Sequence, residues 1–198
     1  MVFASKNNGK TKEIRSMLEG LDFALFSLND YNDIPEIIED GKTFLENALK
    51  KARVVSELTG EVVLADDSGL EVDYLGGEPG IYSSRYSGEN ATDESNIQKL
   101  LESLKGVPTE KRGASFRCVL VLYRPDGTFE NFEGKFQGRI HDRPVGKRGF
   151  GYDPVFFLPE RGITVAELPP EVKNTISHRA QAFNKLKKNL QSGRSAAW

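Results

Sequence analysis

The sequence lacks the residues and segments that mark several large classes of protein. Cys118 is its only cysteine, which excludes a disulfide framework within the chain and a zinc site built from several cysteines. No apolar run approaches the roughly 18 residues of a membrane span. The residues before Lys6 lack the apolar core of a signal peptide. We therefore expect a soluble protein of the cytoplasm with no membrane partner.

An excess of charge of either sign is also absent. The chain has 27 basic and 29 acidic residues, a net charge of −2, and a hydrophobic fraction of 38%. This balance excludes both an intrinsically disordered chain and a globally basic nucleic-acid binder. An anionic partner would be bound by a local cluster of residues, and we expect no nucleic-acid partner.

Hydrophobic periodicity predicts an α/β fold, with a mixed β-sheet flanked by helices. The predicted strands are 2–5, 61–65, 115–123, 128–140 and 155–158. The first predicted helix has Ile14, Met17, Leu18 and Leu21 at helical spacing, with Gly20 as a stop signal, and the second spans 43–60 with Leu45, Ala48, Leu49 and Ala52 as its buried stripe. The third follows a cap at Thr92 or Asp93 and has Ile97, Leu100, Leu101 and Leu104 as its apolar face, and the last spans 177–190. At 198 residues we expect one domain over 1–190, and a flexible tail over 191–198.

A loop rich in polar residues lies between the first predicted strand and helix. Its residues are Ser5, Lys6, Asn7, Asn8, Gly9 and Lys10. Free backbone N–H groups and the helix dipole at such a position bind phosphate well. An ordinary strand-to-helix turn is the alternative. The loop imitates the end of a Walker A motif, but Ala4 stands where that motif needs its first glycine.

Two adjacent carboxylates, Asp66 and Asp67, follow the predicted strand 61–65. Adjacent carboxylates repel each other, and a cation that neutralises them makes the arrangement tolerable. Magnesium prefers such oxygen ligands and binds substrate phosphates as well. The alternative is an Asx turn that leads into Ser68 and Gly69.

Further charged residues could complete such a site. Glu39 lies in an acidic loop where no cap or helix accounts for it, whereas a capping box with Thr43 explains Glu46 better than a metal role does. Lys51 could project from its helix toward phosphates, or lie on a solvated face.

Two later segments are candidates for binding the rest of a ligand. In Gly149–Pro154, glycines allow close backbone approach and Phe150 offers an aromatic face, although a hairpin with Phe150 and Tyr152 in a core is the commoner outcome. Lys173, His178 and Arg179 lie near the start of the closing helix, where positive charge opposes the helix dipole. An anionic ligand would explain that placement, and a solvated cap is the alternative.

Six motifs occur in the chain in the order of a known family. They are Ser5-x-Asn7-x-x-Lys10, Thr43-Phe44-x-Glu46-Asn47-Ala48, Ala65-Asp66-Asp67-Ser68-Gly69-Leu70, Gly76-Gly77-x-Pro79-Gly80-Ile81-Tyr82-Ser83, Gly149-Phe150-Gly151-Tyr152-Asp153-Pro154 and Ser177-His178-Arg179. Together they resemble the inosine triphosphate pyrophosphatase family, also called Ham1-like. One departure is Lys6, where the family usually has glycine.

The resemblance implies an elongated sheet with two lobes, a nucleotide cleft between them, and a homodimer. It implies hydrolysis of ITP, dITP and XTP to the monophosphate and pyrophosphate with Mg²⁺, or with Mn²⁺ as the alternative. The implied catalytic base is Asp67, and the implied metal ligands are Asp67 and Glu39, with Asp66 beside them and Glu36 or Glu46 as alternatives to Glu39. The phosphate ligands would be the loop 5–10 and Lys51. The nucleotide ligands would be Ser68, Phe150, Gly151, Tyr152, Asp153, Lys173, His178 and Arg179.

Two functions of other classes remain open from the residues alone. A non-catalytic nucleotide-binding or RNA-binding protein could use the same basic loop and Phe150, because phosphate contacts and stacking suffice for binding. A phosphotransferase could use Gly9-Lys10-Thr11. Metal-dependent turnover separates the first from an enzyme, and release of pyrophosphate excludes the second.

Overall fold

The computed structural model describes residues 1–18, 24–31 and 34–191. The strands are β1 (Val2–Phe3), β2 (Phe26–Ser27), β3 (Val63–Val72), β4 (Gly113–Tyr123), β5 (Phe129–Ile140), β6 (Phe156–Leu158) and β7 (Ile163–Thr164). The α-helices are α1 (Asn8–Leu18), α2 (Phe44–Thr59), α3 (Asp93–Ser103), α4 (Pro170–Ile176) and α5 (His178–Gln191). Short 3-10 helices lie at Leu28–Asp30, Asp73–Leu75, Gly80–Arg85, Thr109–Lys111, Asp153–Val155 and Val165–Glu167.

One seven-stranded sheet has the order β2-β1-β3-β4-β5-β6-β7. Strand β1 pairs in parallel with β2 and β3, and its Val2 lies opposite Val63. Strand β6 pairs in antiparallel fashion with β5 and β7, with Phe157 opposite Arg139 and Thr164. The predicted α/β fold with a mixed sheet is therefore confirmed.

The chain divides into two compact units. The first unit comprises Met1–Asp67, Cys118–Gly134 and Arg179–Trp198, and the second comprises Ser68–Arg117 and Lys135–His178. Strands β3, β4 and β5 each run from one unit into the other. The chain thus passes between the units along strands rather than through a linker.

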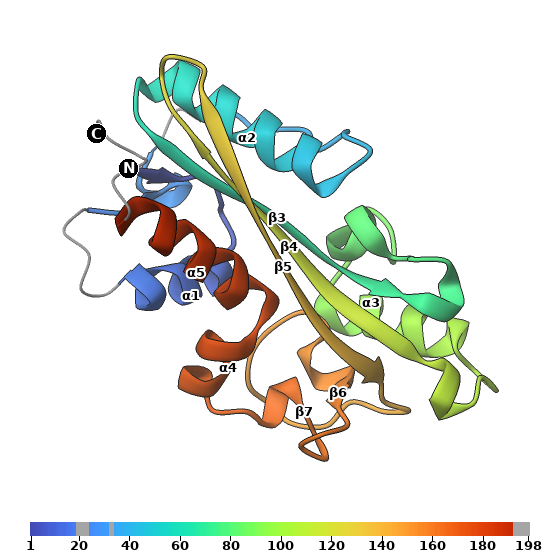
Figure 1. The fold of residues 1–198 in the computed structure, drawn as a ribbon. Helices are drawn as coiled ribbons and strands as arrows, with labels where there is room; N and C mark the ends of the chain where they lie inside the picture. The colour runs from blue at the N-terminus through green and yellow to red at the C-terminus, as the bar shows by residue number, and fades with distance from the viewer. Residues whose placement is uncertain (19–23, 32–33, 192–198) are drawn as a thin grey trace. The chain divides into compact units, whose positions relative to one another are not determined.

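The core of the first unit joins α1 and α5 to one face of the strands. Leu64 of β3 belongs to it, together with alternate residues of β4, as a strand with one buried face requires. Its fully or nearly fully buried members are Phe3, Ile14, Leu18, Leu64, Cys118, Leu120, Leu122, Ala182, Phe183 and Leu186. Helix α2 lies on the opposite side of these strands from α1 and α5 (Figure 1).

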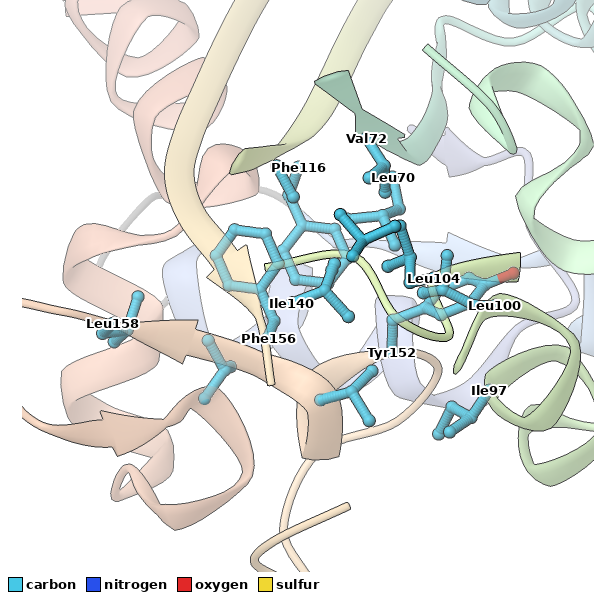
Figure 2. Close-up of a cluster of buried hydrophobic side chains, with 14 of the residues drawn as sticks. Leu70, Val72, Ile97, Leu100, Leu104, Phe116, Ile140, Tyr152, Phe156 and Leu158 are labelled. Carbon is cyan, nitrogen blue, oxygen red and sulfur yellow. The ribbon is translucent and has the colours of Figure 1, made fainter. Parts of the chain in front are cut away.

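The second unit has its own core, built on α3 (Figure 2). The side chain of Thr92 caps α3 by accepting a hydrogen bond from the Ser95 N–H at 3.1 Å. Ile97, Leu100 and Leu104 then face Leu70 and Val72 of β3, while the rings of Phe116 and Phe156 stack with centroids 4.3 Å apart. The prediction of a capped helix with this apolar face is confirmed.

Helix α2 begins and ends where its caps predict. The Thr43 hydroxyl accepts a hydrogen bond from the Glu46 N–H, and Gly60 ends the helix with a φ of 69°. The Glu46 carboxylate binds the Lys42 N–H at 2.6 Å instead of closing the predicted capping box. The buried stripe also differs, because α2 buries the polar residues Asn47 and Lys51 beside its apolar ones.

Two predicted boundaries were wrong, and one helix was not predicted. Strand β3 does not end at residue 65 but continues to Val72, because Leu70 and Val72 alternate into the core of the second unit. The short helix α4, which was not predicted, precedes the closing helix and carries Lys173. The predicted helix stop at Gly20 lies outside the described residues. Gln191 is the last residue of α5 rather than the first of a tail, and the rest of the predicted tail lies outside the described residues.

None of the helices in the described part of the chain combines the length and the apolar character that a membrane span needs.

We expect Leu100→Ala to destabilise the protein strongly, because Leu100 is fully buried in the second core. Removing a buried leucine side chain lowers the free energy of unfolding by about 2–5 kcal/mol. Urea unfolding followed by circular dichroism measures the change. Leu58, on α2 and 55% exposed, is the control, and Leu58→Ala should change stability by less than about 0.5 kcal/mol. Equal effects of the two substitutions would contradict the assignment of the core.

Candidate active site

The loop between β1 and α1 is shaped by its own polar side chains. The Ser5 hydroxyl accepts a hydrogen bond from the Asn7 N–H at 3.1 Å, and the Asn7 carboxamide oxygen accepts one from the Lys10 N–H at 3.0 Å. Asn7 therefore caps α1, and Lys6, Asn7 and Asn8 are exposed. The loop has the geometry that the phosphate-site prediction requires, with the start of an 11-residue helix directed to solvent.

Lys10, the predicted phosphate ligand of this loop, is held by a carboxylate. Its ammonium lies 2.9 Å from Oδ2 of Asp66, and its side chain is 16% exposed. The pair brings the first turn of α1 against the middle of β3. A phosphate would have to compete with Asp66 for the Lys10 ammonium or share it.

Asp66 belongs to a buried network of charges. Its Oδ2 is also 3.4 Å from Nη2 of Arg179, whose Nη1 donates to Oε2 of Glu13. Asp66 is fully buried and Arg179 is 1% exposed. Burial would lower the pKa of Arg179, but Glu13 and Asp66 raise it above its ordinary value, so the guanidinium is charged. The negative charge beside Arg179 at the start of α5 is thus supplied by Glu13 and Asp66.

Asp66 and Asp67 do not form one paired site. Successive side chains of a strand point to opposite faces, and Asp66 contacts residues of α1 and α5 whereas Asp67 contacts residues of α2. The predicted position of the pair at the end of a strand is wrong. Lys10 and Arg179 neutralise Asp66 in this structure, and the expectation that a shared cation neutralises both carboxylates stays a prediction. We therefore leave Asp66 out of the metal site proposed below.

The groups around Asp67 change the pKa of its carboxyl. The Asn47 carboxamide donates a hydrogen bond to its Oδ2 at 3.0 Å, and the Lys51 ammonium is 3.9 Å from its Oδ1. Burial raises the pKa of Asp67 to about 6, although Lys51, Lys10 and Asn47 lower it and Glu39 raises it further. A carboxylate with this pKa is mostly ionised at neutral pH, yet basic enough to accept a proton.

The acidic loop that carries Glu39 is fastened to α2. Lys51 donates to Glu39 Oε1 at 3.1 Å, Lys50 pairs with Asp40 at 2.6 Å, and the Gly41 N–H donates to the Asn47 carboxamide oxygen at 2.8 Å. Glu39 and Asp67 thus flank one ammonium. The two alternatives to Glu39 as a metal ligand are placed differently. Glu46 binds the backbone at the start of α2, and Glu36 is exposed.

The donor set around Glu39 and Asp67 fits a hard divalent cation. Both carboxylates offer oxygen atoms, which is the chemistry that magnesium prefers. Among the described residues, no three His, Cys, Asp or Glu side chains group closely enough to hold a metal by themselves. Two carboxylates still suit magnesium, because it usually keeps several waters and takes further oxygens from substrate phosphates.

In the second unit, the predicted residues Phe150, Asp153 and Lys173 come together. The Lys173 ammonium lies 2.5 Å from Oδ2 of Asp153 and 4.6 Å from the centroid of the Phe150 ring. The same Asp153 oxygen accepts the Phe150 N–H at 2.9 Å. A Cβ at Gly149 would lie only 2.0 Å from this oxygen, so the turn requires glycine. The buried Lys173 ammonium thus lies over one face of the Phe150 ring.

The remaining predicted nucleotide residues divide into two groups. Tyr152 is a core residue whose hydroxyl donates to the Ser83 carbonyl at 2.9 Å, and its burial raises the pKa of the phenol. His178 is 5% exposed and stacks on Phe116. Ser68 and Gly151 are partly exposed, and the Gly151 N–H donates to Asp93 at 2.6 Å. The predicted ligand roles of these residues stay predictions.

Two residues at the site had no role assigned from sequence. Asn47 joins the acidic loop to Asp67, and Glu13 anchors Arg179. A signal for Asn47 was present, because it lies four positions before Lys51 and one before Ala48, on the face of α2 that is buried. A polar residue in a buried stripe needs a partner.

Comparison with known proteins decides the family. A sequence model of the Ham1 family matches residues 1–189. The chain belongs to the Ham1 family. Solved Ham1 structures agree with the fold: a HAM1 protein from Coxiella burnetii has a TM-score of 0.88 at 43% identity, covering 96% of this chain and 98% of that one. The Ham1 protein of Staphylococcus aureus has a TM-score of 0.86 at 41% identity, covering 96% and 97%.

Curated relatives with this family's sequence features carry a more specific name. A protein of Geobacter sulfurreducens named dITP/XTP pyrophosphatase is 56% identical over 190 residues, which is 96% of each chain. A protein of Shigella flexneri with the same name is 49% identical over 195 residues, 98% of each chain. The likeness covers both units of this Ham1 protein.

We expect Asp67→Asn to stabilise the metal-free protein at pH 8. Because the folded pKa of Asp67, about 6, exceeds its ordinary value of 3.8, protonation favours the folded state below pH 4, and this contribution disappears as the pH rises through 6. The neutral variant should therefore gain about 1–3 kcal/mol of unfolding free energy over the wild type at pH 8, and little below pH 4. Urea unfolding at several pH values measures this.

Asp126→Asn is the control for the sign of that effect. Hydrogen bonds from Thr128 lower the pKa of this exposed carboxyl, so its replacement should reduce stability at pH 8. A loss of stability in Asp67→Asn at pH 8 would show that attraction to Lys51 and Lys10 outweighs burial.

Proposed function

We propose that this Ham1 protein hydrolyses non-standard purine nucleoside triphosphates, among them dITP, XTP and ITP, to the monophosphate and pyrophosphate. The family and the name of the curated relatives support this reaction. The observation that carries it for this chain is Asp67, a buried carboxylate with a pKa of about 6 that lies near two lysines and a glutamate. Such a group serves a proton transfer better than it serves stability.

The chemistry assigned to each residue follows from its position. Asp67 would take the proton of a water that attacks the α-phosphorus, and the ammonium groups of Lys10 and Lys51 would stabilise the departing pyrophosphate. Glu39 and Asp67 would hold the divalent cation, which supplies charge neutralisation and orientation of the phosphates when it is bound. The loop 5–10 would receive phosphate oxygens through the N–H groups at the start of α1.

Phe150 and Lys173 would recognise the base. A purine could stack on the Phe150 ring, and Lys173 is a donor that a 6-oxo group can accept from. Adenine presents a donor at that position, which leaves a buried donor unpaired at a cost of about 1–3 kcal/mol, or one to two decades of discrimination. This argument separates hypoxanthine and xanthine from adenine, but not from guanine.

Other parts of the proposal come from the sequence. Magnesium as the metal and a homodimer rest on the family resemblance, whereas a cytoplasmic location and a single functional domain over residues 1–190 rest on the composition and length of the chain. The role is then the removal of deaminated purine triphosphates before a polymerase uses them.

We expect the purified protein to convert ITP to IMP and pyrophosphate only when Mg²⁺ is present, and to spare ATP by at least about tenfold. Ion-exchange chromatography identifies the products. Asp67→Asn should lower kcat by at least about a hundredfold because it removes the base. Near-normal turnover in a folded Asp67→Asn protein would remove the proposed base, and binding of ITP without cleavage would favour a nucleotide-binding protein instead.

We expect Lys10→Ala to raise KM for ITP by about tenfold or more, because a phosphate contact in a shielded site is lost. Lys12 is the matched control, since it lies two residues later on α1 and is exposed. Steady-state kinetics of Lys12→Ala should equal those of the wild type. Unchanged kinetics in Lys10→Ala would show that Lys10 serves only its pair with Asp66.

A further inference from the structure

The Lys51 ammonium lies close to the carboxylates of both Glu39 and Asp67, the two residues proposed to hold a divalent cation. It is 3.1 Å from Oε1 of Glu39, 3.9 Å from Oδ1 of Asp67 and 2.7 Å from the carbonyl oxygen of Asp66. Lys51 is only 8% exposed. Three oxygen atoms from two segments of chain therefore surround one positive charge that water barely reaches.

A divalent cation held by Glu39 and Asp67 would take the same two carboxylates as ligands. Magnesium binds carboxylate oxygens at about 2.0–2.1 Å, and the Lys51 ammonium is already 3.1 Å from Glu39 Oε1 and 3.9 Å from Asp67 Oδ1. Two cations that share the same oxygens repel strongly in a site with little water. The ammonium must therefore move away before both carboxylates can bind a metal.

From this geometry we infer that the Lys51 ammonium neutralises Glu39 and Asp67 when no metal is bound. It thereby lowers the affinity of the substrate-free protein for divalent cations until a triphosphate draws the ammonium away. The inference rests on the proposed function for the triphosphate, whose oxygens are the alternative partners of Lys51. Lysine has a long, flexible side chain that can exchange one anionic partner for another. The metal would then bind together with the substrate rather than before it.

The neighbouring lysine provides a matched control. Lys50 makes an equally close pair with a residue of the same loop, 2.6 Å from Asp40, but its side chain is 32% exposed and that of Asp40 is 66% exposed. Removing Lys50 deletes one positive charge and one contact between the loop and α2. It leaves the oxygens around Lys51 in place.

The test is the affinity of the nucleotide-free protein for Mn²⁺, measured by isothermal titration calorimetry. Lys51→Gln keeps a hydrogen-bond donor for the Asp66 carbonyl but removes the charge, and it should bind Mn²⁺ at least about tenfold more tightly than the wild type. Lys51→Arg and Lys50→Gln should stay near the wild type. Equal or weaker binding by Lys51→Gln would overturn the inference, as would the absence of Mn²⁺ binding in both proteins.

Thermal unfolding gives a second readout that does not depend on activity. Without Lys51, the two carboxylates repel each other, so Lys51→Gln should melt lower than the wild type and regain stability at low Mn²⁺ concentration. Lys51→Gln could fail to fold without metal. In that case, folding on addition of Mn²⁺ supports the inference, and a protein that stays unfolded contradicts it. The same measurement is then made on Lys51→Met. Hydrolysis of ITP by the wild type is measured separately, so failure here leaves the proposed reaction intact.

Discussion

The alternation of side chains along β3 separates two neighbouring carboxylates that would otherwise repel each other. Asp66 points toward α1 and α5, where Lys10 and Arg179 neutralise it, while Asp67 points toward α2 and meets Asn47 and Lys51. Each carboxylate therefore has its own set of partners. This separation leaves Asp66 as the buried anchor of an ionic network and Asp67 as a carboxylate with an adjustable proton affinity.

The buried network on the Asp66 face ties distant parts of the chain together. Glu13 lies on α1 and Arg179 on α5, and the two are 166 residues apart in sequence. A guanidinium that is 1% exposed is tolerable only while its carboxylates remain. The ion pairs therefore fix the register of α1 and α5 against β3 more specifically than their apolar contacts could, and they hold the loop at the start of α1 in place.

Local sequence signals predicted much of this structure, whereas contacts between residues distant in sequence became known only from the structure. The caps Thr43 and Gly60 define α2 because capping is a property of adjacent residues. The end of β3 was misplaced because Asp66 and Asp67 read as a turn when their cationic partners are unknown, and Arg179 lies 113 residues from Asp66. The alternative interpretation that places Tyr152 in a core is correct, but its hydrogen-bond partner Ser83, 69 residues away, was not predicted. The family resemblance supplied the grouping of Glu39 with Asp67, which spacing alone left open among three glutamates.

Asn47 has a consequence for any attempt to redesign the acidic loop. One end of its carboxamide accepts the Gly41 N–H and the other donates to Asp67, and the residue is fully buried. A Cβ on Gly41 would lie 2.7 Å from the carboxamide oxygen of Asn47, so there is no room for a side chain at position 41. Hydrogen bonds of Asn47 thus connect the acidic loop, α2 and β3. Grafting the loop of another protein onto this scaffold would succeed only if the first two turns of α2 were exchanged with it.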